Sequence, residues 1–373
     1  MSWSRTWAIA LRIIRQFRRD PRTLALLFVA PILLLTLIGP LIETETTIRL
    51  GLNNRDRGMV VPAVPGRPAV RQFLSKPLVK SLESAENPAV IRLGRAQIDR
   101  RLKDDRLDGA LLIETDFSRR LAAGKRPPLT IVLEGSNPAI NGEVLTQIPR
   151  RLAAVTGAAA PRLNVTYIYG GSDLDSLDYF APVFIAFFAF FFVFLLTSVS
   201  FLRERGRGTI ERLMASPVAK AEVIAGYLIG FFIFAAVQSL VVLGYTILVL
   251  GAKFAGSLGD ILLIELLLTV GSVNLGIFLS SFARTELQVM QFVPVVVSSQ
   301  GLLSGLIWPI RSMPPILQWL AALMPLTYAN RALRALMIKG LPLGAVKGEV
   351  AFLIGFALLM MFLSGLTIKR EIA

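Results

Sequence analysis

Long apolar stretches alternate with short charged segments along the whole chain. A helix needs about 20 predominantly apolar residues to cross the hydrocarbon core of a bilayer. The pattern therefore predicts a polytopic α-helical membrane protein with six transmembrane helices. The expected spans cover residues 23–42, 179–202, 223–250, 260–282, 289–308 and 350–368.

Charged residues beside these spans predict their orientation. Several arginines precede the first span, and Lys369-Arg370 follow the last one. Basic residues next to apolar spans tend to stay on the cytoplasmic side. We therefore expect a multi-pass protein of a bacterial or archaeal cell membrane, with both termini in the cytoplasm.

Residues 43–178 form the only long segment of mixed polarity, and span parity puts them outside the cytoplasm. Short β-branched runs alternate here with polar helical runs, which is typical of a compact α/β domain. We expect this extracytoplasmic α/β domain to be inserted between the first two transmembrane helices. Its expected strands cover 48–52, 90–93, 107–113, 129–133 and 165–168, and its expected helices 68–84, 95–105, 116–123 and 143–156.

The first 22 residues are basic and also carry regularly spaced apolar side chains. The apolar positions recur at helical intervals, which favours an amphipathic helix lying flat on the cytoplasmic leaflet with its tryptophans at headgroup depth. The alternative is that these residues are simply a basic flank of the first span. The residues expected to define this interfacial helix are Trp3, Trp7, Arg12, Arg15, Arg18 and Arg19.

The charged segment 203–217, RERGRGTIERLMASP, connects the second and third expected spans. Its arginines outnumber its glutamates, which predicts a cytoplasmic position. Gly206 and Gly208 permit a turn, after which Thr209 can cap a short helix that ends near Ser216. From these residues alone the segment is either an ordinary basic loop or a mixed-charge surface for a soluble partner.

A resemblance to a known family favours the partner surface. RERGRGTIERLMASPVAKAEVIAGYLIG is similar to the loop after the second spanning helix of ABC-2 type transporter permeases, where a coupling helix touches a separate ATPase subunit. The resemblance covers nearly the whole chain in its order of apolar spans. It implies that the ATPase-coupling residues are Arg203, Glu204, Arg205, Gly206, Gly208, Thr209, Glu211, Arg212, Met214, Ser216 and Pro217.

A second stretch, LLSGLIWPIRSMPPILQWLAALMPLTYANRALRALMIKG, resembles the proline-rich outer segment that precedes the last span in this family. The apolar run 316–323 within it is too short to cross a bilayer. We expect residues 309–340 to form an outer re-entrant segment, with a short helix that Pro325 ends. Its marker residues are Pro309, Met313, Pro314, Pro315 and Pro325.

Residues inside the expected spans offer candidates for a translocation path. The second span contains FIAFFAFFFVFLL, whose rings either face lipid and neighbouring helices or form a wall for an amphiphilic substrate. Glu265 lies a short way into the fourth expected span. It has three alternative explanations: structural pairing, a position near the interface, or a role in transport. The candidates for this path are Phe187, Phe191, Phe194, Glu265 and Pro294.

Composition excludes several other classes. The net charge is +15, but the basic residues are spread over the chain, so nucleic-acid binding is not expected. The chain has no cysteine and no histidine, which removes thiolate and histidine chemistry, and we expect no catalytic residues. No metal site is expected either, because the aspartates at 99, 104, 105 and 108 lack the oxygen spacing of a calcium loop.

The sequence contains no nucleotide-binding P-loop. We expect no cofactor on this chain, with ATP and Mg²⁺ bound by the partner. The resemblance implies the permease subunit of an ATP-driven exporter for a hydrophobic or amphiphilic substrate such as a drug, lipid or glycolipid. The expected partners are two copies of a cytoplasmic ABC ATPase, a second permease (identical or paralogous) and membrane lipid. An ion-driven secondary transporter and an envelope receptor or scaffold are the alternatives.

Overall fold

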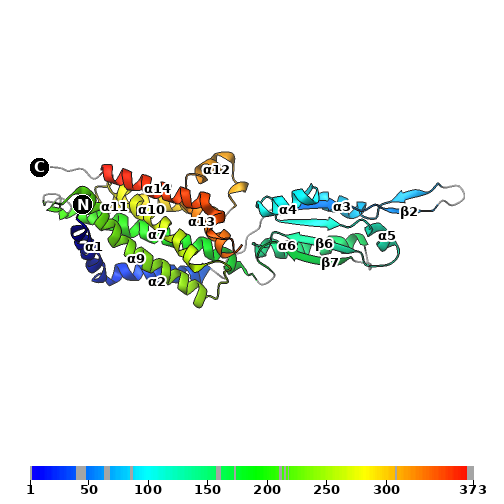
Figure 1. Cartoon of the computed structure of the whole chain (residues 1–373), viewed down its shortest axis with the longest axis horizontal. Coiled ribbons are helices and arrows are strands. Elements are labelled where there is room, and N and C mark those ends of the chain that lie inside the picture. Colours follow the sequence, from blue (N-terminus) through cyan, green and yellow to red (C-terminus); the bar gives the residue numbers. More distant parts are fainter. Residues whose placement is uncertain are drawn as a thin grey trace. The chain divides into compact units, whose positions relative to one another are not determined.

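The computed structural model describes residues 2–38, 48–62, 68–84, 87–156, 161–171, 174–209, 212–213, 216, 218–306 and 309–367. The chain divides into two compact units. Unit 1 combines Met1–Leu41 with Phe180–Ala373 and is helical, whereas unit 2 is Ile42–Tyr179 and contains the sheets (Figure 1).

Four helices of the described part are long and apolar enough to cross a membrane. They correspond to the expected second, third, fourth and sixth spans, whereas the expected first and fifth spans coincide with α2 and α11, which are not among these four. The helices of unit 1 are α1 (Trp3–Arg18), α2 (Pro21–Ile38), α7 (Ser176–Gly206), α9 (Lys220–Leu248), α10 (Leu258–Ser280), α11 (Glu286–Leu303), α12 (Pro315–Ala321), α13 (Pro325–Met337) and α14 (Lys347–Thr367).

Helix α7 is the most enclosed of these four helices, and α14 is the least enclosed. Small residues allow the helices around it to approach closely. A Cβ at Gly276 of α10 would lie 3.0 Å from Thr197 Cβ and 3.1 Å from the Phe194 carbonyl oxygen of α7. Such close approach by glycine is typical of helices that pack within a membrane.

Helix α13 is joined to the C-terminal end of α11 by buried hydrogen bonds. Asn330 donates to the Ser304 carbonyl oxygen at 3.1 Å, and the Leu326 amide donates to Gln300 Oε1 at 3.3 Å. The short helix expected before Pro325 corresponds to α12, which ends at Ala321, and Pro325 is the first residue of the next helix, α13. The first helical turn tolerates proline because its missing N–H has no partner within the helix.

Unit 2 is built on a five-stranded sheet of order β4-β1-β5-β6-β7. All neighbouring strands are parallel except β5 and β6, where Ile113 pairs with Leu129 in antiparallel register. The elements are β1 (Arg49–Asn54), α3 (Lys76–Glu83), β4 (Ala89–Arg92), α4 (Arg95–Lys103), β5 (Gly109–Ile113), α5 (Phe117–Ala122), β6 (Pro128–Leu133), α6 (Pro138–Thr156) and β7 (Arg162–Tyr167).

Alternation along the strands divides the core between the two faces of the sheet. In β5, Leu111 and Ile113 pack in a cluster with Phe117 of α5, whereas Ala110 and Leu112 pack in a separate cluster with residues of α4. Successive side chains of a strand point to opposite faces, so a strand buried on both sides is apolar throughout. This explains the uninterrupted run GALLI, whose residues are all buried.

The five strands expected from the sequence correspond to β1, β4, β5, β6 and β7. One expected helix, 68–84, is wrong in its first half. Its N-terminal part contains strand β3 (Val70–Gln72), which pairs with β2 (Met59–Val61) in a two-stranded antiparallel sheet. Pro68 and the β-branched Val70 are poor helix formers and favour an extended backbone here.

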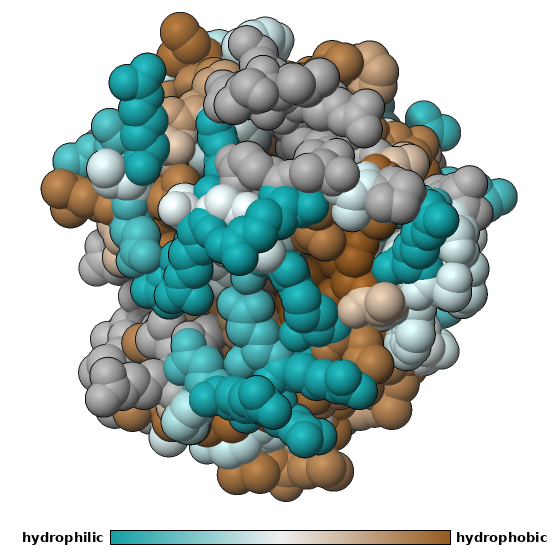
Figure 2. Space-filling model, turned by 90° about the vertical axis from the view of Figure 1, so that its left-hand side faces the viewer, coloured by the Kyte–Doolittle hydropathy of each residue, from teal (hydrophilic) through white to brown (hydrophobic). Residues whose placement is uncertain are grey.

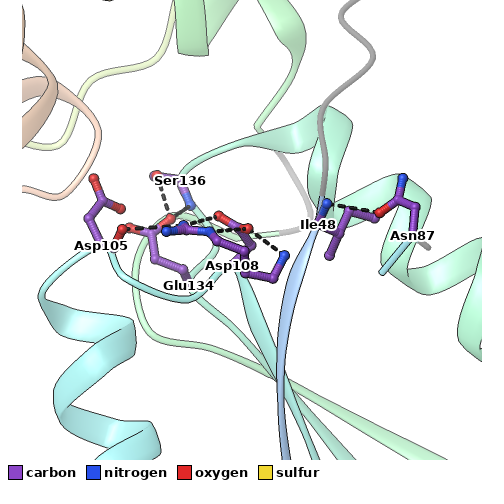
Figure 3. A network of polar contacts seen from close by, with 7 residues as sticks. Ile48, Asn87, Asp105, Asp108, Glu134 and Ser136 are labelled. Carbon is purple, nitrogen blue, oxygen red and sulfur yellow. Dashed lines mark hydrogen bonds and ion pairs between the residues drawn. The ribbon is translucent and has the colours of Figure 1, made fainter. Parts of the chain in front are cut away.

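A network of charged and polar side chains fixes the start of β1 (Figure 3). Arg49 donates to Asp108 at 2.8 Å, and Asp108 also accepts the Arg49 amide at 2.8 Å. The Ile48 amide donates to Asn87 Oδ1 at 2.9 Å. Asp108 is only 7% exposed, because its carboxylate pairs with the guanidinium of Arg49 and also accepts the Arg49 amide.

At the opposite end of β1, Asp56 organises a second network. Its carboxylate accepts hydrogen bonds from the Ser118 hydroxyl, from the Ser118 amide at 3.1 Å and from the Gly58 amide at 3.1 Å. Burial alone would raise the pKa of Asp56, but these hydrogen bonds outweigh it and lower the pKa below the ordinary 3.8. Asp56 therefore stabilises unit 2 in its ionised form.

We predict that Asp56→Asn destabilises unit 2 by about 1 kcal/mol at pH 7, allowing for the partial exposure of this group. A carboxyl whose pKa is lowered by folding stabilises the fold above its unfolded pKa, and this contribution is lost as pH falls through the folded value. The difference between the two proteins should therefore be constant at neutral pH and shrink below about pH 4. Hydrogen exchange of amides from β1 to α5 measures it.

Asp99→Asn is the matched control, because Asp99 makes an exposed pair with Arg95 on α4. It should change exchange very little at any pH. Equal effects of the two substitutions would contradict the role given to Asp56.

Candidate coupling interface

Helix α1 runs alongside the first half of α9. Thr6, Ile9, Ala10, Ile13 and Phe17 are the buried residues of α1. A Cβ at Gly226 of α9 would lie 2.7 Å from the Ile9 side chain, and one at Gly230 would lie 2.9 Å from Ile13. Because these two residues of α9 are glycines, α1 can pack closely against α9.

The amphipathic helix expected from the sequence is present as α1, and its apolar face packs on another helix of unit 1. That face is buried against α9, as the edge-to-face contact of Phe17 with Phe231 also shows. Trp3 and Trp7 remain 70% and 44% exposed, so they are available at the headgroup depth expected for them. Periodicity reveals that a helix has an apolar face but not what covers it.

Arg12 connects α1 to both helices that flank the segment 203–217. Its guanidinium donates to Glu204 of α7 and, at 2.9 Å, to the Tyr227 hydroxyl of α9. Tyr227 in turn donates to Glu204 Oε2 at 3.0 Å, which closes a triangle of three residues. Glu204 is 7% exposed, so its charge is matched within the chain and is not presented to a partner.

A second contact fixes the N-terminal end of α1. Glu222, at the start of α9, accepts the backbone amide of Ser2 and lies 3.9 Å from Arg5. Its other oxygen accepts the Ala219 amide at 3.0 Å, so the same carboxylate caps α9. A single residue thus fixes the beginnings of both helices.

The last turn of α7 is linked to the connection between α10 and α11. Arg203 makes two hydrogen bonds to Glu286 at 2.9 and 3.1 Å, and Arg205 donates to the Ser281 carbonyl oxygen at 2.7 Å. Sequence reasoning missed Ser281 and Glu286, although an acidic residue in the second expected inner loop was a usable signal. The two connections therefore form one surface.

Beyond α7, the described residues of the segment agree with a turn followed by a helical stretch. Gly208 has φ +67°, a left-handed conformation that favours glycine. Thr209, Arg212 and Leu213 are helical, and the Ser216 amide donates to the Leu213 carbonyl oxygen at 3.2 Å. The predicted residues Glu211, Met214 and Pro217 lie outside the described residues.

Figure 2 shows the end of the molecule where α1 begins, and hydrophilic side chains run across this face beside apolar ones. Basic side chains are exposed on α1 and around the segment. They are Arg15, Arg18, Arg19, Arg203, Arg205, Arg207 and Arg212. Such a surface suits a partner with acidic groups.

The candidate translocation residues do not meet at one surface. Phe194 is buried where α7 packs on α10, whereas the Phe187 ring faces Gly301 of α11. Glu265 is fully buried in α10. Pro294 lies on the exposed side of α11. Among the described residues, no cluster of three acidic side chains that could hold a metal is found.

Comparison with known proteins identifies the class. Residues 21–366 match the model of the ABC-2 family transporter proteins, so the chain belongs to this family. Its members are transport subunits of membrane-embedded ABC permeases, which implies an ATPase subunit as partner.

The chain is similar to several individual proteins of this kind. The chain is 24% identical to "Probable multidrug ABC transporter permease YbhS" of Escherichia coli, over 100% of this chain and 98% of the relative. It is 23% identical to "Linearmycin resistance permease protein LnrN" of Bacillus subtilis, over 94% and 96%. It is 27% identical to "ABC transporter G family member 20" of Dictyostelium discoideum over 55% of this chain, which spans only 28% of that longer relative.

We predict that Gly226→Ala displaces α1, because the added Cβ would be too close to Ile9. Gly244→Ala on the same helix is the matched control, since its Cβ would meet nothing within 4 Å. The first variant should lower the melting temperature in detergent by several degrees, and the second should leave it unchanged or raise it slightly. Equal melting temperatures would contradict the packing of α1 on α9.

We also predict that Glu204→Gln and Arg12→Ala each destabilise unit 1 by about 1–3 kcal/mol, because either leaves a half-buried partner unmatched. In a double-mutant cycle the two losses should not add, since both remove one interaction. Arg15→Ala, on the exposed side of α1, should have little effect. If the losses of stability caused by Arg12→Ala and Glu204→Gln were additive, the two side chains would not interact energetically.

Proposed function

We propose that this chain is the permease subunit of an ATP-driven ABC exporter. It moves a hydrophobic or amphiphilic substrate, such as a drug, lipid or glycolipid, outward across the cell membrane. The energy comes from a separate ATPase subunit that binds ATP and Mg²⁺. Family membership and the similarity to relatives named as multidrug and linearmycin-resistance permeases support this proposal.

The observation that carries the proposal is the triangle of Arg12, Glu204 and Tyr227. It joins α1 to the helices on both sides of the segment 203–217. A force applied to that segment by a partner is therefore transmitted to α7 and α9 together, with α1 moving as one body with them. Through Arg203 and Arg205 the same movement reaches α10 and α11.

The topology we propose has six spans, with α2 and α11 as the first and fifth. Both termini are cytoplasmic, and unit 2 lies outside the cytoplasm. The assembly contains two ATPase copies and a second permease, identical or paralogous. In this arrangement the exposed residues of the segment contact the ATPase, whereas Glu204 acts from inside the permease by positioning α1.

The experiment is reconstitution of the chain with its ATPase in liposomes. ATP-dependent accumulation of a fluorescent amphiphile, absent without the ATPase, supports an exporter. Flux driven by an ion gradient in the absence of nucleotide would establish a secondary transporter and overturn the proposal. A folded complex that moves no amphiphile and shows no substrate-stimulated hydrolysis would also contradict it.

We predict that Arg207→Glu with Arg212→Glu reduces permease-stimulated ATP hydrolysis at least about fivefold, because both side chains are exposed on the segment and the reversal opposes an acidic partner. The melting temperature of the permease should not change. Arg100→Glu with Lys103→Glu, exposed on α4 of unit 2, is the control and should leave hydrolysis intact. Reversal of Glu204 is a poor test, because it would break the contact with Arg12.

A further inference from the structure

One end of the main sheet of unit 2 is strongly basic. The carboxyl ends of β1 and β5 meet the amino ends of β6 and β7 there, as the pairings of Ile113 with Leu129 and of Pro128 with Arg162 require. The residues that follow β1 remain attached to this end, because the Arg57 amide donates to the Thr115 carbonyl oxygen at 3.0 Å. The Leu74 amide donates to Ser118 Oγ at 2.7 Å, which adds the start of α3.

We call this surface the basic end. Its basic side chains are all exposed, and the only ion pair there among the described residues is that of Arg120 with Asp116. Asp56 uses its carboxylate internally, and Glu114 is the remaining acidic residue. The basic residues are Arg55, Arg57, Arg71, Lys76, Arg119, Arg120, Lys125, Arg126 and Arg162.

An exposed hairpin extends from the basic end. Strand β2 begins and strand β3 ends beside the basic end. In the described part of the chain, these two strands pair only with each other. Val60 and Val70 are 60% and 56% exposed and lie on opposite faces of this small sheet. An isolated two-stranded sheet with apolar side chains on both faces is at most marginally stable in water, and its outer edges keep unpaired backbone groups.

We propose that the basic end and its hairpin are the docking surface for an acidic polypeptide segment of a protein on the same side of the membrane. The arginines supply paired donors for carboxylates, and the hairpin supplies apolar contact and a free strand edge. A polyphosphate or lipid headgroup would use the charge but neither the valines nor the backbone donors.

A second copy of the chain is a poor occupant of this surface. The chain passes from unit 1 into β1 and leaves unit 2 after β7, and both points lie at the end opposite to the basic end. A symmetric contact between two copies at this surface would place one basic end against the other, and like charges would oppose it.

The test measures binding of a labelled ten-residue peptide of alternating glutamate and valine to the full chain in detergent, by fluorescence anisotropy at physiological salt. Arg57→Glu, Arg119→Glu and Arg126→Glu together should weaken binding at least about tenfold. The matched control reverses Arg100, Lys103 and Arg106, which are exposed outside the basic end, and should bind as the native chain does.

Two further arms separate the docking surface from a general anion patch. Val60→Thr with Val70→Thr should weaken the alternating peptide severalfold but leave the weaker binding of polyglutamate unchanged. The proposal is overturned if inorganic polyphosphate binds as tightly as the peptide and the valine substitutions have no effect. It is equally overturned if the peptide does not bind, or if the control reversal weakens it as much as the reversal at the basic end.

Discussion

The contact of Arg12 with Glu204 and Tyr227 is the interaction on which the organisation of unit 1 depends. A carboxylate buried at the end of an apolar helix is costly unless an opposite charge and hydrogen-bond donors match it. Arg12 supplies both from a different helix. The requirement to match one charge therefore fixes α1 in register with α7 and α9, and the glycine face of α9 then allows the backbones to approach.

This arrangement has a mechanical consequence for a member of a family whose permeases partner with an ATPase subunit. The start of segment 203–217 is connected to the rest of unit 1 by the side chains of Arg203, Glu204 and Arg205, not only by the covalent chain. Arg203 and Arg205 extend these links to α10 and α11. A displacement of the segment thus acts on several helices at once, which is what a rearrangement of a bundle requires.

Much of the fold could be predicted from the sequence, because hydrophobic length and alternation are local properties. The apolar runs became α7, α9, α10 and α14, and the five strands of the main sheet were recognised from their β-branched runs. What the sequence did not reveal depends on contacts between distant residues. The burial of Glu204 requires Arg12, 192 positions away, and the hairpin of β2 and β3 was hidden in an expected helix.

The single antiparallel pairing of β5 with β6 also has a consequence for how this protein can change over evolutionary time. If all five strands were parallel, the first strand would start at one end of the sheet and the last strand would finish at the other end. These two points would be about 20 Å apart, which is the length of one strand. The reversal brings the start of β1 and the finish of β7 to the same side. Unit 2 can therefore be lost, shortened or replaced by another module as a cassette, leaving the helices before and after it undisturbed.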